Sequence, residues 1–271
     1  MKRYNNVFKK LLSNNEGAFI PFVVIGDPSI EYTKNIIDII INSGADALEL
    51  GFPFSDPVAD GPTIQSAMMR ALKSGVDQNF CFSCIKEIRN KYPQIPIGIL
   101  VYANLVFCNG IEEFYKKCQE SGVDSVLIPD LPIEESSNFC KVANYYNIDE
   151  IFICPPNATD NFLKKISKLG RGYIYLVSRL GITGVEDNQL LFLKSLINKL
   201  KKYNSVPIIQ GFGISNTDQI KTIIQSGATG VISGSVIIKI IEENQSNLTL
   251  LCKKLNSIVR LLKNATINTI I

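Results

Sequence analysis

Short apolar runs alternate with longer amphipathic runs from one end of the chain to the other. The short runs are rich in Ile, Val, Leu, Phe and Tyr, which favour β-strands, and several of them end at Gly or Pro. They predict strands at 19–25, 46–51, 96–102, 124–129, 150–154, 172–177, 206–211 and 229–234. The amphipathic runs predict helices at 30–43, 62–73 with 78–91, 111–121, 134–146, 160–169, 189–203, 216–226 and 236–243, preceded by one at 2–13 and followed by one at 248–263.

Strands that alternate with helices are typical of parallel βαβ units. Eight such units fit a closed (βα)8 barrel, a fold that forms one domain of roughly 250 residues. We therefore expect an α/β protein made of one (βα)8 TIM-barrel domain over residues 1–271, with an extra N-terminal helix and additional helices. An open doubly wound sheet is the alternative, but the turn after the first strand, Gly26–Ser29, lacks the glycine-rich dinucleotide fingerprint of that fold.

The composition limits the classes of function. The chain is 46% hydrophobic and 20% charged, and its net charge of +3 is too small to predict binding to nucleic acid. The N-terminal segment lacks the long apolar run of a signal peptide. The most apolar later run, Val231–Ile241, is too short to span a membrane and contains Lys239. These features predict a soluble, cytoplasmic protein with no membrane segment.

The cysteines and the absence of histidine narrow the chemistry further. Seven Cys residues with irregular spacing predict reduced thiols, and Cys81 and Cys84 form an isolated CxxC pair in a predicted helix. A zinc site needs about four ligands, so we expect two apolar helix residues here and no metal site. Because the chain has no His, Ser-His-Asp triads and Cys-His pairs are excluded, and acid–base chemistry falls to Asp, Glu, Lys, Tyr or Cys.

Glu49 is the first candidate for such chemistry. Side chains alternate along a strand, so Leu48 and Leu50 should face the helices, whereas Ala47 and Glu49 should face the barrel interior. Burying a charge there is costly without a partner or a function, and barrel enzymes carry their catalytic residues at the carboxyl ends of strands. The alternative is a structural Glu that pairs with a Lys or with a capping N–H group.

Asp60 is the second candidate. It lies in the loop 51–62, whose Asp, Pro and Gly residues are typical of a shaped turn. A helix that begins near Pro62 would also make Asp60 a candidate N-cap residue, and a plain turn residue is the other structural alternative. The local sequence does not decide between a role in the site and these structural roles.

Glycine-rich turns follow the last strands. Gly211–Ser215 and Ser233–Ser235 come after the seventh and eighth predicted strands, where barrel enzymes often bind phosphate through loop amides and a helix N-terminus. Ordinary turn glycines are the alternative. A third glycine loop, Arg179–Gly184, follows the sixth strand and suits a lid over the substrate. On that strand an inward Tyr175 would line an aromatic pocket, donate a hydrogen bond or fill the core.

Several of these segments resemble the α subunit of tryptophan synthase. The most specific is the acidic, proline-rich segment Leu48–Gln65, with the sequence LELGFPFSDPVADGPTIQ. The segments Pro21–Pro28 and Tyr102–Asn104 and the turns at Gly211 and Ser233 also match. The likeness covers nearly the whole chain, from residue 18 to residue 245, whereas the glycine turns alone are shared with other phosphate-binding barrels.

The resemblance implies retro-aldol cleavage of indole-3-glycerol phosphate to indole and glyceraldehyde 3-phosphate. Glu49 matches the general acid–base residue of the family, and Asp60 matches the group that hydrogen-bonds the indole N–H. The resemblance also implies Tyr175 and Thr183 as supporting groups, Phe22, Ile64, Leu100 and Leu127 as the apolar slot for indole, and Gly184, Gly213, Gly234 and Ser235 as the phosphate site, with Phe212 beside the substrate.

The resemblance further implies a partner. The α chain of this family pairs with a pyridoxal-phosphate β chain in an αββα complex, so the loop with Pro53 and Asp56 and the region of Asn104 should face that chain. The cofactor would belong to the partner, and none is expected in this chain. The chain departs from the family at Val24, where many relatives have Thr, and at Pro129, where a small residue is common.

Two other interpretations compete with this one. A different phosphate-binding barrel enzyme would need a strand-end Lys, as in indole-glycerol-phosphate synthase, or metal-binding His residues, as in a sugar-phosphate epimerase. The predicted strands supply no such Lys and the chain has no His. A non-catalytic subunit that only activates its β partner is the other alternative, and the presence of Glu49 and Asp60 argues against it.

Overall fold

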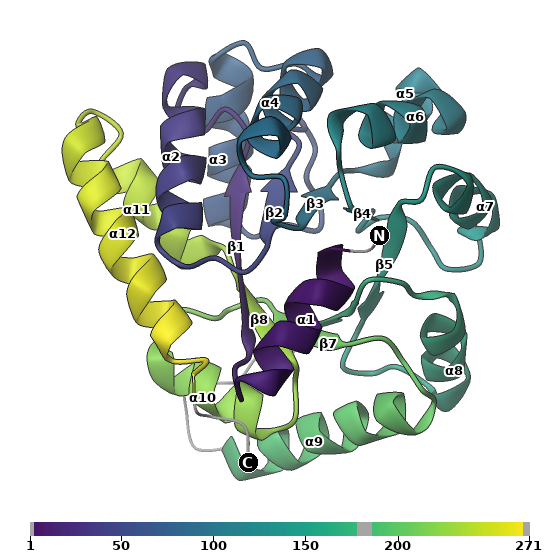
Figure 1. Ribbon diagram of the computed structural model, residues 1–271. Coiled ribbons are helices and arrows are strands. Elements are labelled where there is room, and N and C mark those ends of the chain that lie inside the picture. Colours follow the sequence, from purple (N-terminus) through teal and green to yellow (C-terminus); the bar gives the residue numbers. More distant parts are fainter. Residues whose placement is uncertain (1–2, 178–185, 268–271) are drawn as a thin grey trace.

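Eight parallel strands close into a barrel in chain order (Figure 1). This computed structural model describes residues 3–177 and 186–267, apart from the side chains of 186–190. Within these residues the strands are β1 (Ala18–Val24), β2 (Leu48–Gly51), β3 (Ile97–Leu100), β4 (Ser125–Leu127), β5 (Asp149–Cys154), β6 (Ile174–Val177), β7 (Ile208–Gly211) and β8 (Gly230–Ser233). The closed barrel confirms the predicted fold class, and the alternative of an open sheet is wrong.

Helices connect the strands and surround the barrel (Figure 1). In the described part of the chain they are α1 (Arg3–Ser13), α2 (Ile30–Asn42), α3 (Pro62–Lys73), α4 (Gln78–Lys91), α5 (Ala103–Asn109), α6 (Ile111–Ser121), α7 (Ser137–Tyr145), α8 (Asp160–Leu169), α9 (Glu186–Lys202), α10 (Thr217–Gln225), α11 (Ser235–Glu243) and α12 (Leu248–Asn264). Each amphipathic run that predicted a helix overlaps one of them, and the differences lie at the ends.

Helix α5 is the element that the sequence pattern missed. The third strand was predicted to run to residue 102, but β3 ends at Leu100 and the helix begins at Ala103. A helix of seven residues is too short for its periodicity to stand out from that of an apolar strand. Asp130, in the loop after β4, accepts a hydrogen bond from the Ala103 amide at 2.9 Å and so satisfies a free N–H at the helix start.

Aspartates in front of two strands replace part of the predicted ladder. Asp46 was predicted as a strand residue, but β2 begins at Leu48 and the Asp46 carboxylate accepts a hydrogen bond from the Phe19 amide at 2.8 Å. Asp124 likewise lies before β4 and accepts a hydrogen bond from the Ile97 amide at 2.8 Å. Strands β2 and β4 therefore begin later than predicted, because these aspartate side chains accept the hydrogen bonds at their starts.

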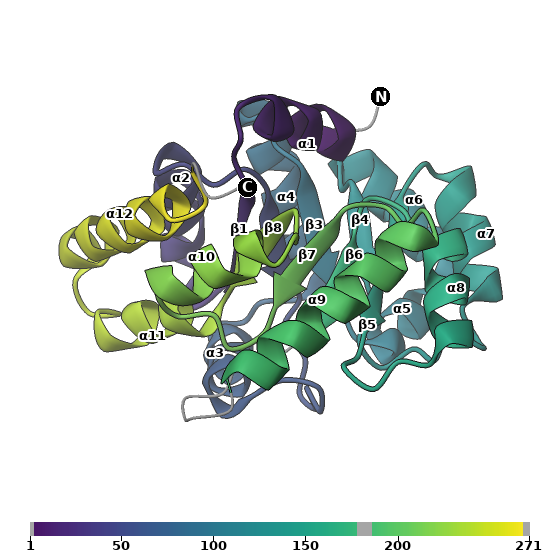
Figure 2. The same ribbon diagram turned by 90° about the horizontal axis from the view of Figure 1, so that it is seen from below.

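Helix α1 covers the amino-terminal end of the barrel, and Figure 2 shows it at the end opposite α5. The Tyr4 hydroxyl lies 2.9 Å from the Ser125 hydroxyl, and the Tyr4 ring packs edge-on against Tyr173, with ring centres 5.5 Å apart. Gly98 leaves room for this side chain, since a Cβ at that position would lie 2.9 Å from the Tyr4 hydroxyl. Side chains thus fill this end of the interior, and the opposite end remains for a site.

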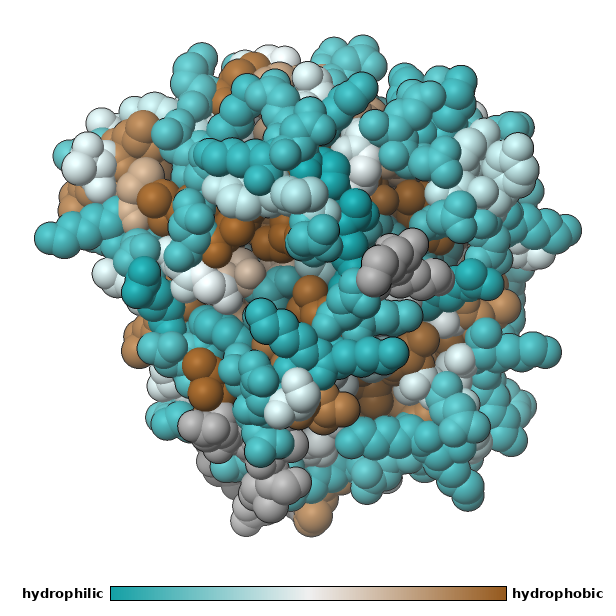
Figure 3. All heavy atoms as spheres, viewed as in Figure 1, coloured by the Kyte–Doolittle hydropathy of each residue, from teal (hydrophilic) through white to brown (hydrophobic). Residues whose placement is uncertain are grey.

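The surface of the α1 end is mixed in polarity. On the face shown in Figure 3, hydrophilic residues dominate and apolar residues lie in separate small patches. Among the described residues, no helix combines the length and the apolar character that a membrane span requires.

Candidate active site

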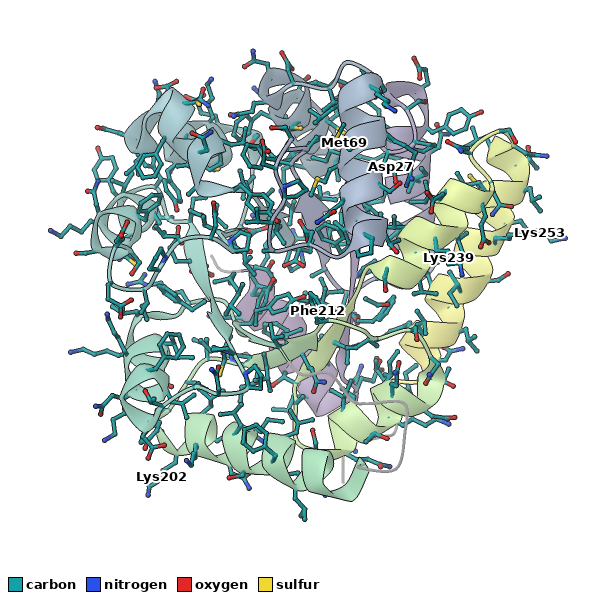
Figure 4. All side chains as sticks on the ribbon, turned by 180° about the vertical axis from the view of Figure 1, so that it is seen from behind. Asp27, Met69, Lys202, Phe212, Lys239 and Lys253 are labelled. Atoms are coloured by element: carbon teal, nitrogen blue, oxygen red, sulfur yellow. The ribbon has the colours of Figure 1, made fainter. Side chains whose placement is uncertain are left out.

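A cavity of about 250 Å³ opens at the carboxyl ends of the strands. Its lining joins both carboxylate candidates to apolar side chains and to the glycine turns after β7 and β8. The lining residues are Phe22, Glu49, Asp60, Gly61, Pro62, Thr63, Ile64, Leu100, Tyr175, Phe212, Gly213, Ile232, Gly234 and Ser235. Figure 4 views the molecule from this side, with Phe212 near the centre of the barrel. This position matches the end at which (βα)8 barrels carry their sites.

Glu49 points into the cavity from β2, as the strand alternation predicted. Glu49 is only 2% exposed, and the Tyr173 hydroxyl donates a hydrogen bond to its Oε1 at 3.0 Å. Burial raises the pKa of Glu49, the Tyr173 hydrogen bond lowers it and the nearby Asp60 raises it, and together they place it at about 7. Glu49 pairs with neither a Lys nor a capping amide in the described structure, so it can both give and accept a proton near neutral pH.

Asp60 is held by a tyrosine and does not cap a helix. Helix α3 begins at Pro62, and its N-cap residue is Gly61. The Asp60 Oδ2 instead accepts a hydrogen bond from the Tyr102 hydroxyl at 2.8 Å. Burial raises the pKa of Asp60, and the Tyr102 hydrogen bond lowers it because the hydroxyl favours the charged form. The N-cap alternative is therefore wrong, and the carboxylate lines the cavity.

Tyr102 also fixes the loop that carries Asp60. Its hydroxyl accepts a hydrogen bond from the Ala59 amide at 3.1 Å, and its ring stacks on Phe54 with ring centres 5.1 Å apart. The same oxygen thus contacts the backbone before Asp60 and the Asp60 side chain itself. This arrangement restricts the carboxylate to one position at the cavity wall.

The turns after β7 and β8 present backbone to the cavity. Phe212 and Gly213 both have positive φ, +78° and +75°, and Gly234 precedes the first residue of α11, Ser235. A Cβ on Gly234 would lie 3.0 Å from the Phe22 ring, so glycine allows the turn to approach β1. The described lining contains no Lys or Arg. An anion here would bind to backbone amides and to the positive end of the α11 dipole.

Tyr175 reaches the cavity across β7. A Cβ on Gly211 would lie 2.1 Å from the Tyr175 hydroxyl, so this strand position has room only for glycine. Burial raises the pKa of Tyr175 well above its usual value, as do the nearby Glu49 and Asp60 carboxylates. Tyr175 therefore stays protonated at neutral pH and can serve as a hydrogen-bond donor.

Most of the predicted site residues lie together, with three exceptions. Leu127 is buried on β4 as the register partner of Leu100, but it is not among the residues that line the cavity. Thr183 and Gly184 lie outside the described residues. Sequence reasoning also missed Tyr102 and Tyr173 as partners of the two carboxylates. For Tyr173 a signal existed, because it shares its strand face with Tyr175.

The residues expected to meet a partner divide into two groups. Asp56 and Asn104 are exposed at the same end of the barrel as the cavity mouth, whereas Pro53 is buried in the chain. Two exposed apolar side chains accompany them, Val58 in the loop after β2 and Phe107 on α5. The departure at Pro129 does not interrupt β4, because the strand ends at Leu127.

The CxxC pair plays no part in the site. Cys81 and Cys84 are buried on α4, and burial raises the pKa of Cys84 to about 11. Across residues 3–177 and 186–267, no group of three or more His, Cys, Asp and Glu side chains is arranged to hold a metal ion.

The fold and this cavity define a (βα)8-barrel enzyme with a buried carboxyl group at its mouth. Residues 8–267 match the family model described as tryptophan synthase alpha chain. The chain is 54% identical to the tryptophan synthase alpha chain of Citrobacter koseri, over 98% of this chain and 99% of that one. It is 53% identical to that of Escherichia coli strain SMS-3-5 over the same shares. The chain belongs to the tryptophan synthase alpha chain family.

Solved structures agree with this assignment. Tryptophan synthase subunit alpha from Legionella pneumophila superimposes with a TM-score of 0.89 at 28% identity, over 98% of each chain. A chain of the tryptophan synthase complex from Pyrococcus furiosus gives a TM-score of 0.82 at 32% identity, over 92% of this chain and 98% of that one. The reaction of the family is the cleavage of indole-3-glycerol phosphate, a lyase step in the biosynthesis of tryptophan.

Proposed function

We propose that Glu49 and Asp60 divide the retro-aldol cleavage of indole-3-glycerol phosphate between them. The observation that carries this proposal is the environment of Glu49, a buried carboxyl group with a pKa of about 7 at an apolar cavity. Carbon–carbon cleavage here needs a proton delivered to carbon and another removed from oxygen, and one carboxyl group poised near neutral pH can do both.

In this proposal protonated Glu49 gives its proton to C3 of the indole ring. The ring nitrogen then carries positive charge, and Asp60 accepts a hydrogen bond from its N–H and stabilises that cation. Glu49, now ionised, removes the proton of the glycerol hydroxyl next to the ring. The bond between the ring and the glycerol carbon breaks, its electron pair returns to the ring, and indole and an aldehyde form. Glu49 ends the cycle protonated, as it began.

The remaining cavity residues bind and orient the two halves of the substrate. We assign the indole ring to the apolar side formed by Phe22, Ile64 and Leu100, with Leu127 packed behind them. We assign the phosphate to the amides around Gly213, Gly234 and Ser235, beside Phe212. Tyr175 serves as a supporting donor near the reacting atoms. Thr183 and Gly184, from outside the described residues, are included on the family resemblance.

We also propose a β subunit as the partner, in an αββα complex. Two similar structures from Pyrococcus furiosus support this, one of the tryptophan synthase complex and one of the tryptophan synthase a2b2 complex. Asp56 and Asn104 contact the partner in this proposal, joined by the exposed Val58 and Phe107. Pro53, buried in the chain, shapes the loop from within. Pyridoxal phosphate belongs to the β chain.

The test is indole release from indole-3-glycerol phosphate by the purified chain, with and without a β subunit. Wild-type chain should release indole, and Glu49→Gln should not, although it should still bind the substrate. A Glu49→Gln chain with activity within tenfold of wild type would contradict the role of Glu49. Activation of the β reaction without any indole release by the wild-type chain would favour the non-catalytic alternative.

A further inference from the structure

One polar cluster outside the cavity joins three segments that line it. Arg70, on α3, forms two hydrogen bonds with the Asp27 carboxylate, Nε to Oδ1 at 2.7 Å and Nη2 to Oδ2 at 3.1 Å. Its Nη1 donates to Oε1 of Glu242 on α11 at 2.7 Å and to the Ser66 hydroxyl at 3.1 Å. The Ser66 hydroxyl in turn donates to the same Glu242 oxygen at 3.2 Å. Four of these five hydrogen bonds are donated by one guanidinium group.

The three segments that Arg70 joins each supply part of the cavity. Asp27 follows β1, whose Phe22 lines the indole side, and Figure 4 places it beside α3, the helix that carries Met69. Thr63 lies seven residues before Arg70 on α3, and Ser235 lies seven residues before Glu242 on α11. Seven residues are about two helical turns, so each side chain of the pair lies roughly 10 Å along its helix from a cavity residue. The contact between α3 and α11 is therefore fixed at the same depth on both helices.

We propose that Arg70 and Glu242 are positioning residues that set the spacing between the indole half and the phosphate half of the cavity. The start of α3 follows Asp60 and provides Ile64, whereas the start of α11 provides Ser235. The ion pair holds these two starts in register. Because this inference rests on the proposed function, the substrate whose length is matched is the indole-glycerol phosphate of that reaction.

The chemistry of the cluster suits a spacer rather than a reacting group. The Asp27 side chain has no exposure and that of Arg70 is 15% exposed, so this pair anchors the guanidinium in the fold. The Glu242 side chain is 41% exposed, and its loss should therefore cost little folding stability while it removes this ion pair between α11 and α3. A planar guanidinium with several donors fixes three partners in one geometry, which a Lys could not.

The positioning role predicts different effects on a ligand that occupies both halves of the cavity and on ligands that occupy only one half. A ligand that spans both halves binds more tightly than its separate parts only where the distance between the two subsites matches its length. The affinity of a ligand that occupies one half does not depend on that distance. Glu242→Ala should therefore weaken binding of indolepropanol phosphate, an uncleavable indole joined to a phosphate, by about tenfold. The affinity of the Glu242→Ala variant for indole alone and for inorganic phosphate alone should stay within twofold of wild type.

The control is Glu243→Ala on the same helix. Glu243 is the next residue, and its ion pair is an exposed one with Lys239 at 4.0 Å on α11 itself. This variant should match wild type with all three ligands. Glu242→Gln keeps an acceptor for Arg70 and should lie between wild type and Glu242→Ala, which also provides a second variant if the alanine chain folds poorly.

Isothermal titration calorimetry on the full chain gives the three dissociation constants for each variant. Glu242→Ala within twofold of wild type for indolepropanol phosphate would overturn the positioning role. An equal loss of affinity for inorganic phosphate would also overturn it, because the effect would then be local to the start of α11. Failure of the unmodified chain to bind indolepropanol phosphate would instead overturn the proposed function, and the positioning role with it.

Discussion

Two buried glutamates lie on opposite faces of the barrel wall. Glu49 on β2 is 2% exposed and Glu150 on β5 is 5% exposed, and each accepts a hydrogen bond from one tyrosine hydroxyl, that of Tyr173 or Tyr115. Burial raises the pKa of Glu49 to about 7 and that of Glu150 to about 8. By proton affinity alone, the two residues are equally good candidates for acid–base chemistry.

Access to a substrate separates the two glutamates. Glu49 faces the barrel interior and lines the cavity of about 250 Å³. Glu150 faces the surrounding helices, where Tyr115 on α6 covers its carboxyl group. A perturbed pKa therefore indicates burial, and it indicates a reactive site only where the group also meets a cavity that can hold a ligand.

The strongest test of this comparison is to neutralise each glutamate in turn. Glu49→Gln should lower the rate of indole release by at least about a thousandfold, because the group that protonates the ring and deprotonates the glycerol hydroxyl would be lost. Glu150→Gln should leave the rate within about twofold. Steady-state assays of both variants give the ratio, and a comparable loss in Glu150→Gln would break the distinction drawn from access.

Asp60→Asn should have the next largest effect. The amide keeps the size of the side chain but cannot stabilise the ring cation by charge, so turnover should fall by about a hundredfold. Because Asp60 is not an N-cap residue, the circular dichroism spectrum and the melting temperature should stay close to those of wild type. A large loss of melting temperature would show that the residue supports the fold after all.

Tyr173→Phe should change the pH dependence more than the maximal rate. The Tyr173 hydroxyl stabilises ionised Glu49, so its removal should raise the Glu49 pKa above 7. In the proposed cycle Glu49 starts protonated, so kcat/KM falls as pH rises through this pKa. The falling limb should move to higher pH in the variant. Titration of the substrate phosphate affects both enzymes equally and therefore cancels in the comparison. A falling limb of the kcat/KM profile that stays at the same pH would refute the effect of Tyr173 on the Glu49 pKa.

Glu150→Gln should have the smallest effect on turnover but a distinct effect on stability. The folded-state pKa of Glu150 lies above that of the unfolded chain, so its contribution to stability is full below about pH 4.5 and is lost as pH rises towards about 8. The glutamine variant does not lose this stability as the pH rises, because its side chain does not ionise. Its free energy of unfolding minus that of wild type should grow from pH 5 to pH 8 by at most about 1.4 kcal/mol per pH unit and then level off. Urea unfolding at several pH values measures it, and a constant difference would argue against a neutral buried Glu150.

The fold was predictable because its pattern repeats. Eight apolar runs in alternation with amphipathic runs determine a barrel even where single boundaries are wrong, as at Asp46 or at residues 101 and 102. Those errors have a local cause, since apolar periodicity does not report where a side chain such as Asp46 takes over the hydrogen bonding of a strand end. Helix α5 was missed because it has only seven residues and because Asp130 from another loop stabilises its start.

The site was predictable to the extent that it depends on strand alternation and on glycine turns. Glu49, Tyr175 and Gly234 lie where those local rules place them. The role of Asp60 depended on Tyr102, which lies more than forty residues away in sequence. The cluster around Arg70 joins Asp27 to Glu242, and no local pattern could bring these residues together. Contacts between segments that are distant in sequence determine the site geometry, and such contacts cannot be predicted from local patterns in a single sequence.

The position of α1 has a consequence for how the protein is made. Its buried face of Tyr4, Phe8 and Leu11 leaves the ribosome well before Tyr173, the ring that Tyr4 meets, because Tyr173 is synthesised about 170 residues later. At a synthesis rate of about 5–20 residues per second, this helix waits roughly 10–30 s for its partner strand. During that interval the apolar face of α1 lacks the Tyr173 ring, so this amphipathic helix is exposed to chaperones and to misassembly.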